Sequence, residues 1–409
     1  MKLAGSSFWL YALPVMLMGI GLANLYSIEN FPAFSWSSNF YRQVVWAMLT
    51  VSVMGVVSVV EGGFWRYLAY VIYGGAIGLM VLTILVGREV NGARAWLEVG
   101  GIRIQSSEFA KVATALAVAR FLDMSPDFSW RKGRDALVIL GLVAMPMLLA
   151  ILQKDTGTAL TFGAFVVPLY RYGMSGWMIV GPVVGGGLAF LSLVYGWKVA
   201  TGVGAGLALL GYLWWRRWGI ALLLGAALMG WAWLAPKVYE WVLAPHQRRR
   251  VEVLLDPYKD PRGSGWNVIQ VRIAIEAGGF WGRGYGQGLQ SKLDFIPQRH
   301  TDFAFCGIAE EWGWAGSVFL IGLFIGLLWA LMTCAEKSNS TFGLIFGYSL
   351  AGILGMHFAI NLGMILGLLP VIGIPLPFIS YGGSSWVAMG WGIGVMKRLY
   401  RERSLRLFG

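Results

Sequence analysis

The chain has 409 residues, of which 57% are hydrophobic and only 13% are charged, and its formal net charge is +12. A soluble domain of this length could not bury so much apolar surface. A membrane span needs roughly 20 apolar residues, and the chain supplies such runs repeatedly. We therefore expect an all-α polytopic membrane protein, in which positive cytoplasmic loops are the simplest explanation of the net charge.

Apolar runs predict the membrane spans. We expect twelve of them, near residues 8–27, 43–60, 67–87, 107–122, 135–152, 158–173, 176–196, 199–215, 219–235, 303–333, 342–364 and 384–396. No cleavable signal is expected, because the first run is long enough to span and lacks a small-residue cleavage motif after it. Most Lys and Arg fall in loops that share a side with both termini, which places both termini in the cytoplasm. The loops at 88–106, 236–302 and 365–383 then face outward.

The fourth expected span carries charges in its first turn. Ser106 or Ser107 can cap this helix, with Glu108 beside them complementing the helix dipole. Glu108 and Lys111 are three residues apart and therefore neighbours on one helical face. Charges at the end of a span should face a protein interior or a water-filled cavity. Two roles stay open for them, an internal ion pair that fixes helix packing and a pair that binds substrate.

A short polar stretch, QKDTGTAL at residues 153–160, separates two spans. Lys154 and Asp155 interrupt the apolar sequence there. The simplest interpretation is a tight outer turn in which Asp155 caps the following helix.

A second stretch, residues 361–385, contains three prolines that forbid one continuous helix through it. Broken backbone at membrane depth is tolerated only where it is buried in protein or lines a cavity. Ser380 and Ser384 could bind a ligand there or could simply satisfy the backbone.

The longest polar segment, residues 236–302, lies between two spans. Within it Asp256 and Asp260 each precede a proline, which restricts both to extended or turn geometry. A rigid aspartate above a membrane cavity could act as a general base or hold a cation, or it could simply start a turn. No zinc spacing, Ser-His-Asp order or P-loop stands out, and the chain has only three histidines.

Taken in order, these motifs resemble those of the SEDS family, the RodA/FtsW peptidoglycan polymerases. The resemblance covers about residues 88–390 and rests on NGARAWLEVGGIRIQSSEFAK, KDTGTAL, RVEVLLDPYKDPRGSGWNVIQ, GYGQGLQSKLDFIPQRHTDFAF, IAEEWGW and GLLPVIGIPLPFISYGGSS. The GIPLPFISYGG form is more similar to the RodA branch, which acts in cell elongation, than to the FtsW branch, which acts in division.

This resemblance implies a SEDS-type helical bundle that polymerises lipid II into glycan strands at the outer face of the bacterial cytoplasmic membrane. The reaction would be a hexosyl transfer with undecaprenyl diphosphate as leaving group. The implied partners are lipid II, the nascent lipid-linked glycan and a class B penicillin-binding protein, with no nucleic acid. A divalent cation, Mg²⁺ or Mn²⁺, stays open as a cofactor. A lipid-linked precursor flippase and a non-catalytic scaffold of the elongasome or divisome are the alternative functions.

The resemblance also assigns site residues. Asp260, which precedes Pro-x-Gly-x-Gly, takes the position of the family's essential loop aspartate. Glu108 and Lys111 match the paired charges of the SEFAK motif, and Asp155 matches the Asp-x-Gly-Thr motif. The residues expected to bind substrate or line the cavity are Glu108, Lys111, Arg94, Asp155, Arg248, Arg272, Lys292, Arg299, Ser380 and Ser384.

The chain departs from the family pattern in two places. The family has ten spans and one helix before the large loop, whereas residues 176–235 here could hold three. We expect residues 176–215 to be an inserted helical hairpin within a single membrane domain of residues 1–409, with the catalytic site in the 236–302 loop. The competing interpretation is a re-entrant segment and a single span. Lys154 stands where the family often has proline, which bears on the shape of that turn.

Overall fold

The computed structural model describes residues 2–31, 33–90, 92–242, 245–259, 264–292, 295–296 and 298–407. Asp260, the expected catalytic residue, lies outside these ranges. The chain forms two compact units, one of Met1–Gly173 with Asn267–Gly409 and the other of Met174–Trp266.

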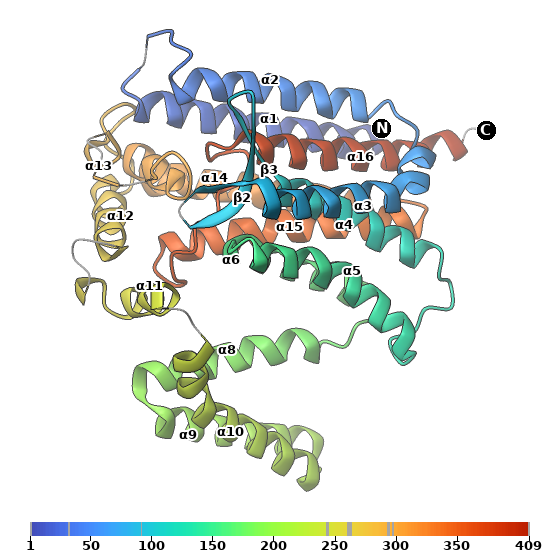
Figure 1. The fold of residues 1–409 in the computed structure, drawn as a ribbon, viewed down its shortest axis with the longest axis vertical. Helices are drawn as coiled ribbons and strands as arrows, with labels where there is room; N and C mark the ends of the chain where they lie inside the picture. The colour runs from blue at the N-terminus through green and yellow to red at the C-terminus, as the bar shows by residue number, and fades with distance from the viewer. Residues whose placement is uncertain are drawn as a thin grey trace. The chain divides into compact units, whose positions relative to one another are not determined.

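The first unit is a bundle of long helices that lie side by side (Figure 1). They are α1 (Lys2–Ile28), α2 (Asn39–Val57), α3 (Gly62–Val86), α4 (Ser106–Asp123), α5 (Gly133–Leu152), α14 (Ala304–Glu336), α15 (Thr341–Ile365) and α16 (Gly383–Leu407). Helix α4 packs against α3, α5, α15 and α16 and is buried along nearly all of its length. Its many alanines suit this central position, because small side chains let neighbouring helices approach closely.

The helical segments agree with the apolar runs of the sequence. Eight helices of the described chain are long and apolar enough to cross a membrane. Each of the twelve expected spans coincides with helical structure, which confirms a polytopic helical fold. The segment expected at 158–173 is divided into α6 (Thr156–Thr161), a 3-10 turn η1 (Phe162–Phe165) and α7 (Val166–Arg171). Pro168 gives a reason, because proline has no N–H to donate to the preceding turn.

A small antiparallel sheet, which was not predicted, precedes α4. Its strands β1 (Arg88–Val90), β2 (Ala93–Val99) and β3 (Ile102–Gln105) follow one another in space, and Leu97 pairs with Ile104. Gly100 and Gly101 join β2 to β3 with φ angles of 58° and 82°. Two consecutive positive φ angles are typical of a two-residue hairpin turn, so the Gly-Gly pair was the overlooked signal.

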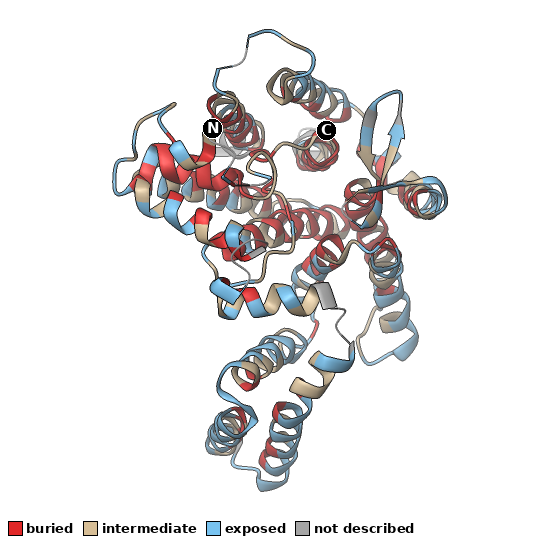
Figure 2. Ribbon diagram, turned by 60° about the vertical axis from the view of Figure 1, so that its left-hand side comes forward, coloured by how far each residue is buried: buried red, intermediate tan, exposed pale blue. Residues whose placement is uncertain are grey.

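The second unit contains α8 (Trp177–Tyr195), α9 (Trp197–Trp215), α10 (Trp218–Val242), α11 (Pro245–Leu255) and a 3-10 turn η2 (Pro257–Lys259). Helices α8 and α9 meet at Gly196, whose φ of 85° favours glycine. Both pack on α10, where Ser192 Oγ donates to Ala232 O at 2.7 Å and Trp231 Nε1 donates to Gly185 O at 2.8 Å. The residues of these three helices are mainly exposed (Figure 2). Helices occupy both segments of the expected hairpin, and of these two only α8 is among the eight described helices long and apolar enough to cross a membrane. The insertion and its side of the membrane stay predictions.

We predict that the turn between α8 and α9 faces outward. A cysteine in place of Lys198 should react with a membrane-impermeant thiol reagent in intact cells, because the charge bias places this turn outside. The native Cys306 and Cys334 are both buried, so the unaltered chain gives a low background. A cysteine in place of the exposed Arg216, at the other end of α9, should react only after permeabilisation. The same late labelling at position 198 would reject the hairpin.

Candidate functional site

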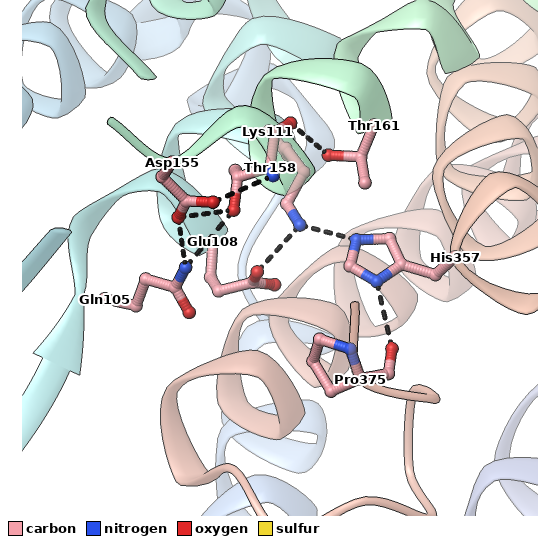
Figure 3. Close-up of polar contacts among 8 residues, drawn as sticks. All are labelled: Gln105, Glu108, Lys111, Asp155, Thr158, Thr161, His357 and Pro375. Carbon is pink, nitrogen blue, oxygen red and sulfur yellow. Dashed lines mark hydrogen bonds and ion pairs between the residues drawn. The ribbon is translucent and has the colours of Figure 1, made fainter. Parts of the chain in front are cut away.

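A buried cluster of Glu108, Lys111 and His357 lies where α4 packs against α15 (Figure 3). Lys111 Nζ lies 2.8 Å from Glu108 Oε1 and 2.6 Å from His357 Nε2. The side chains of Lys111 and Glu108 are 0% and 2% exposed. The predicted ion pair is therefore formed inside the protein, where a charge must be paired to be tolerated. His357 was not predicted as part of it.

Asp155 lies beside this cluster at the start of α6 (Figure 3). Its carboxylate accepts hydrogen bonds from Thr158 N at 3.0 Å, Thr158 Oγ1 at 2.7 Å and Gln105 Nε2 at 2.9 Å. The expected helix-capping turn is present, and these bonds tie the end of β3 to α6. The preceding Lys154 has a φ of 59°, which proline cannot adopt. The turn therefore has a shape that the family's usual proline would not allow.

Three side chains hold the broken segment, which is residues 366–382 between α15 and α16. Asn361 Nδ2 donates to Asp302 O at 2.8 Å and to Ile374 O at 2.7 Å. Ser380 Oγ donates to Thr301 O at 2.5 Å and accepts from Leu376 N at 2.8 Å. His357 Nδ1 lies 3.2 Å from Pro375 O. Ser380 thus satisfies backbone groups, which was one of its two expected roles.

Further buried polar groups lie beside the ion pair. The Ser385 hydroxyl interacts with the Glu108 carboxylate, and the neighbouring Ser384 is also buried. Asn361 Oδ1 has no hydrogen-bond partner among the described residues. An unsatisfied buried polar group costs about 1–3 kcal/mol, so Asn361 Oδ1 is a candidate to bind a polar group of a substrate.

The other basic candidates lie on separate elements. Arg94 is exposed on β2, 3.5 Å from Glu89, and the exposed Arg272 on α12 (Ser264–Gly278) lies over Gly367 at the end of α15. Lys292 Nζ, at the end of α13 (Leu289–Lys292), donates to Gly286 O at 2.5 Å.

Arg299 Nη1 donates to Lys292 O at 3.1 Å, and Arg248 on α11 donates to Glu240 O. In the β-sheet loop, the Arg88 guanidinium lies 2.7 Å from Glu98 Oε2 and holds the pKa of that carboxyl below its usual range. Of the six basic candidates, only Lys111 belongs to the buried cluster as the structure describes it.

A second feature is a break inside α14. Gly313 has a φ of 65° and a ψ of −159° there, a conformation nearly restricted to glycine. The break leaves backbone N–H groups of α14 without acceptors in their own helix. The loop after α12 supplies those acceptors. Trp314 N donates to Gly279 O at 2.9 Å and Ala315 N donates to Phe280 O at 3.0 Å.

Two buried carboxylates beside this break accept hydrogen bonds from α13 and from α1. Glu310 accepts hydrogen bonds from the backbone N–H groups of Gln290 at 2.9 Å and Ser291 at 3.0 Å. Glu311 accepts one from Ser27 Oγ on α1. Neither glutamate was predicted as a site residue, although charged residues in an apolar run were a usable signal.

A helical bundle with a buried ion pair and a broken helix beside it defines a polytopic membrane protein with an internal polar site. The model of the FTSW_RODA_SPOVE family of cell cycle proteins matches residues 7–202 and 198–405, so the chain belongs to this family. The expected SEDS membership is thereby confirmed, and the chain is a multi-pass membrane protein. The two matches meet at the start of α9.

Individual relatives agree with this assignment. The chain is 34% identical over 370 residues to peptidoglycan glycosyltransferase MrdB of Escherichia coli K12, covering 89% of this chain and 85% of that protein. It is 32% identical over 424 residues to peptidoglycan glycosyltransferase RodA of Treponema pallidum, covering 95% and 97%.

Among solved structures, a chain of a peptidoglycan synthase complex has a TM-score of 0.71 and 31% identity, with 96% of this chain and 97% of that chain covered. The crystal structure of the rod shape determining protein RodA of Thermus thermophilus has a TM-score of 0.62 and 27% identity, with 96% of each chain covered.

We predict that Glu108 and Lys111 stabilise the fold only as a pair. Glu108→Gln should lower stability by about 3–5 kcal/mol, because it leaves the Lys111 ammonium buried without its counter-charge. Glu108→Gln combined with Lys111→Met removes both charges at similar volume and should restore most of that loss. Thermal unfolding of the purified variants in detergent measures both effects. A Glu108→Gln protein as stable as the wild type would show that the pair is solvated.

We also predict that Gly313 is required for the break in α14. In Gly313→Ala the new Cβ would meet Gly282 N and lie 2.7 Å from Phe280 O, in a backbone conformation that alanine avoids. We expect a destabilisation of roughly 2–4 kcal/mol. Gly322→Ala is the matched control, because nothing lies within 4 Å of its Cβ position in the same helix. Equal thermal stability of the two variants would contradict the strain argument.

Proposed function

We propose that this protein is a peptidoglycan glycosyltransferase of the RodA type, which polymerises lipid II at the outer face of the bacterial cytoplasmic membrane during elongation. The observation that carries the proposal is the match, over nearly the whole chain, to peptidoglycan glycosyltransferases MrdB and RodA. The buried pair of the SEFAK motif and the broken segment of the GIPLPFISYGG motif support it, because both place polar groups inside a membrane bundle.

The reaction needs a base and a site for a diphosphate. The growing glycan is the donor, undecaprenyl diphosphate leaves, and the 4-hydroxyl of the incoming GlcNAc attacks. A carboxylate within hydrogen-bond reach of that hydroxyl takes its proton. We assign this role to Asp260, in the short connection between η2 and α12. Asp256, by contrast, accepts from Tyr258 N at 3.1 Å and so acts as the start of a turn.

Lys111 supplies positive charge for the diphosphate. Its ammonium uses two of its three N–H groups on Glu108 and His357, and the third is available for a phosphate or sugar oxygen. Because Lys111 is fully buried, a substrate reaches it only when the covering segments move.

Asp260 is the proposed protein ligand of a divalent cation. No group of three or more His, Cys, Asp and Glu side chains suited to a metal occurs within the ranges that the structure describes. Asp260 together with diphosphate oxygens would offer the oxygen ligands that Mg²⁺ or Mn²⁺ prefers. The cation would neutralise charge on the leaving diphosphate.

The proposed partner is a class B penicillin-binding protein, the transpeptidase that would crosslink the new strands. A related solved chain belongs to a peptidoglycan synthase complex that coordinates polymerization and crosslinking. The distribution of Lys and Arg supports cytoplasmic termini and an outward-facing large loop.

We predict that polymerisation depends on the charge of Asp260. Purified protein with its class B partner should convert lipid II into glycan strands, and Asp260→Asn should reduce the rate at least about 100-fold, because it removes the base at nearly unchanged size. Asp256→Asn, four residues earlier, is the control and should keep most of the activity. Gel analysis of fluorescent lipid II measures both.

The alternatives give different outcomes. A flippase would transport lipid II in vesicles without polymerising it and would tolerate Asp260→Asn. A scaffold would tolerate any folded loop variant. Near-wild-type polymerisation by a folded Asp260→Asn protein would contradict the assignment of Asp260 as the base.

A further inference from the structure

The hydrogen bonds of His357 determine its charge and tautomer. Nδ1 lies 3.2 Å from Pro375 O, and a carbonyl can only accept, so Nδ1 carries a proton. Nε2 lies 2.6 Å from Lys111 Nζ, and an ammonium can only donate, so Nε2 carries none. His357 is then a neutral imidazole that accepts from Lys111 and donates to Pro375.

A transfer of the proton from Lys111 to His357 is disfavoured. An ammonium holds its proton far more tightly than an imidazolium does. Glu108 Oε1, 2.8 Å from Lys111 Nζ, stabilises the charge on the lysine. The cluster therefore contains one anion, one cation and one neutral ring, so that no net charge is buried.

His357 shares the task of holding the broken segment with a residue one helical turn away. His357 and Asn361 are four residues apart on α15 and so lie on one face of it. Asn361 Nδ2 donates to Ile374 O at 2.7 Å, and His357 donates to the next carbonyl, Pro375 O. Two successive carbonyls of the segment are thus fixed to one helix face, and His357 also contacts Lys111 (Figure 3).

We propose that His357 is a positioning residue. It is anchored to the broken segment through Pro375 O, and it orients the ammonium group of Lys111. Pro375 O fixes the plane of the imidazole, and the imidazole with Glu108 fixes two N–H groups of Lys111. The third N–H of Lys111 is the one that we assign to a diphosphate oxygen. Its direction then depends on the position of the broken segment. This inference rests on the proposed function, but its first two tests do not use activity.

The first test reads the tautomer by ¹⁵N nuclear magnetic resonance of histidine-labelled protein in lipid. The chain has three histidines, so a single His→Gln variant assigns each signal. We expect a neutral His357 protonated at Nδ1. An imidazolium, or a ring protonated at Nε2, would overturn the proposal.

The second test separates the two hydrogen bonds with matched variants. An asparagine amide reaches the place of Nδ1 and can donate to Pro375 O, whereas a glutamine amide reaches the place of Nε2 and can accept from Lys111. Hydrogen exchange of the backbone amides of Ile374, Leu376 and residues 378–381 should stay near wild type in His357→Asn. In His357→Gln it should become faster by roughly five- to tenfold, because one anchoring bond is lost. Equal exchange in the two variants would overturn the link to Pro375.

The third test is polymerisation of lipid II by the same variants. His357→Asn should lose at least about tenfold in rate while it stays folded at the assay temperature, because the segment is held but Lys111 is no longer aimed. A purely structural residue would lose activity only together with the folded state. Full activity of a stable His357→Asn protein would overturn the positioning role. If the wild type does not polymerise lipid II, the proposed function fails, while the tautomer and the exchange rates still decide the hydrogen-bonded chain.

Discussion

A charge buried between apolar helices has to find its partners inside the protein, and Lys111 imposes this constraint on the whole bundle. Its counter-charge comes from Glu108 on the same helix, and its second partner comes from His357 on α15. Helix α4 brings them together because its small side chains let α3, α5, α15 and α16 pack around it and exclude water. The small side chains of α4 therefore account both for the close packing of the helices and for the burial of the polar site.

The loops before α4 and after α12 are held to the bundle by hydrogen bonds as well as by apolar contacts such as the stacked rings of Phe280 and Trp314. Arg94 N in β2 donates to Gln153 O at the end of α5 at 2.9 Å, and Gln105 at the end of β3 reaches Asp155. The loop after α12 is fixed to α14 through Gly279 and Phe280. Polar groups at these junctions are satisfied locally, as buried backbone requires.

Local sequence predicted those parts that depend on local spacing. Apolar runs predicted the helices, the three-residue spacing predicted the Glu108–Lys111 pair, and the position of Asp155 predicted a cap. The β-hairpin was also predictable, since Gly100 and Gly101 follow an alternating strand pattern.

His357 was not predictable in this way, because it is a single histidine in an apolar helix and its partner Lys111 lies 246 residues away. The break at Gly313 was hidden for the same reason, because the groups that replace its helical hydrogen bonds come from another segment. Asp260 was assigned from resemblance, since an Asp-Pro pair alone is more often a turn.

The break in α14 has a mechanical consequence. Gly279 and Phe280 are bonded into the helix as if they were part of its ladder, and Glu310 and Glu311 accept hydrogen bonds from the loop and from α1. A displacement of this loop must therefore break these hydrogen bonds or move the adjoining turns of α14, a helix of 33 residues that packs against α1 and α15. The loop and this part of α14 are accordingly expected to move together.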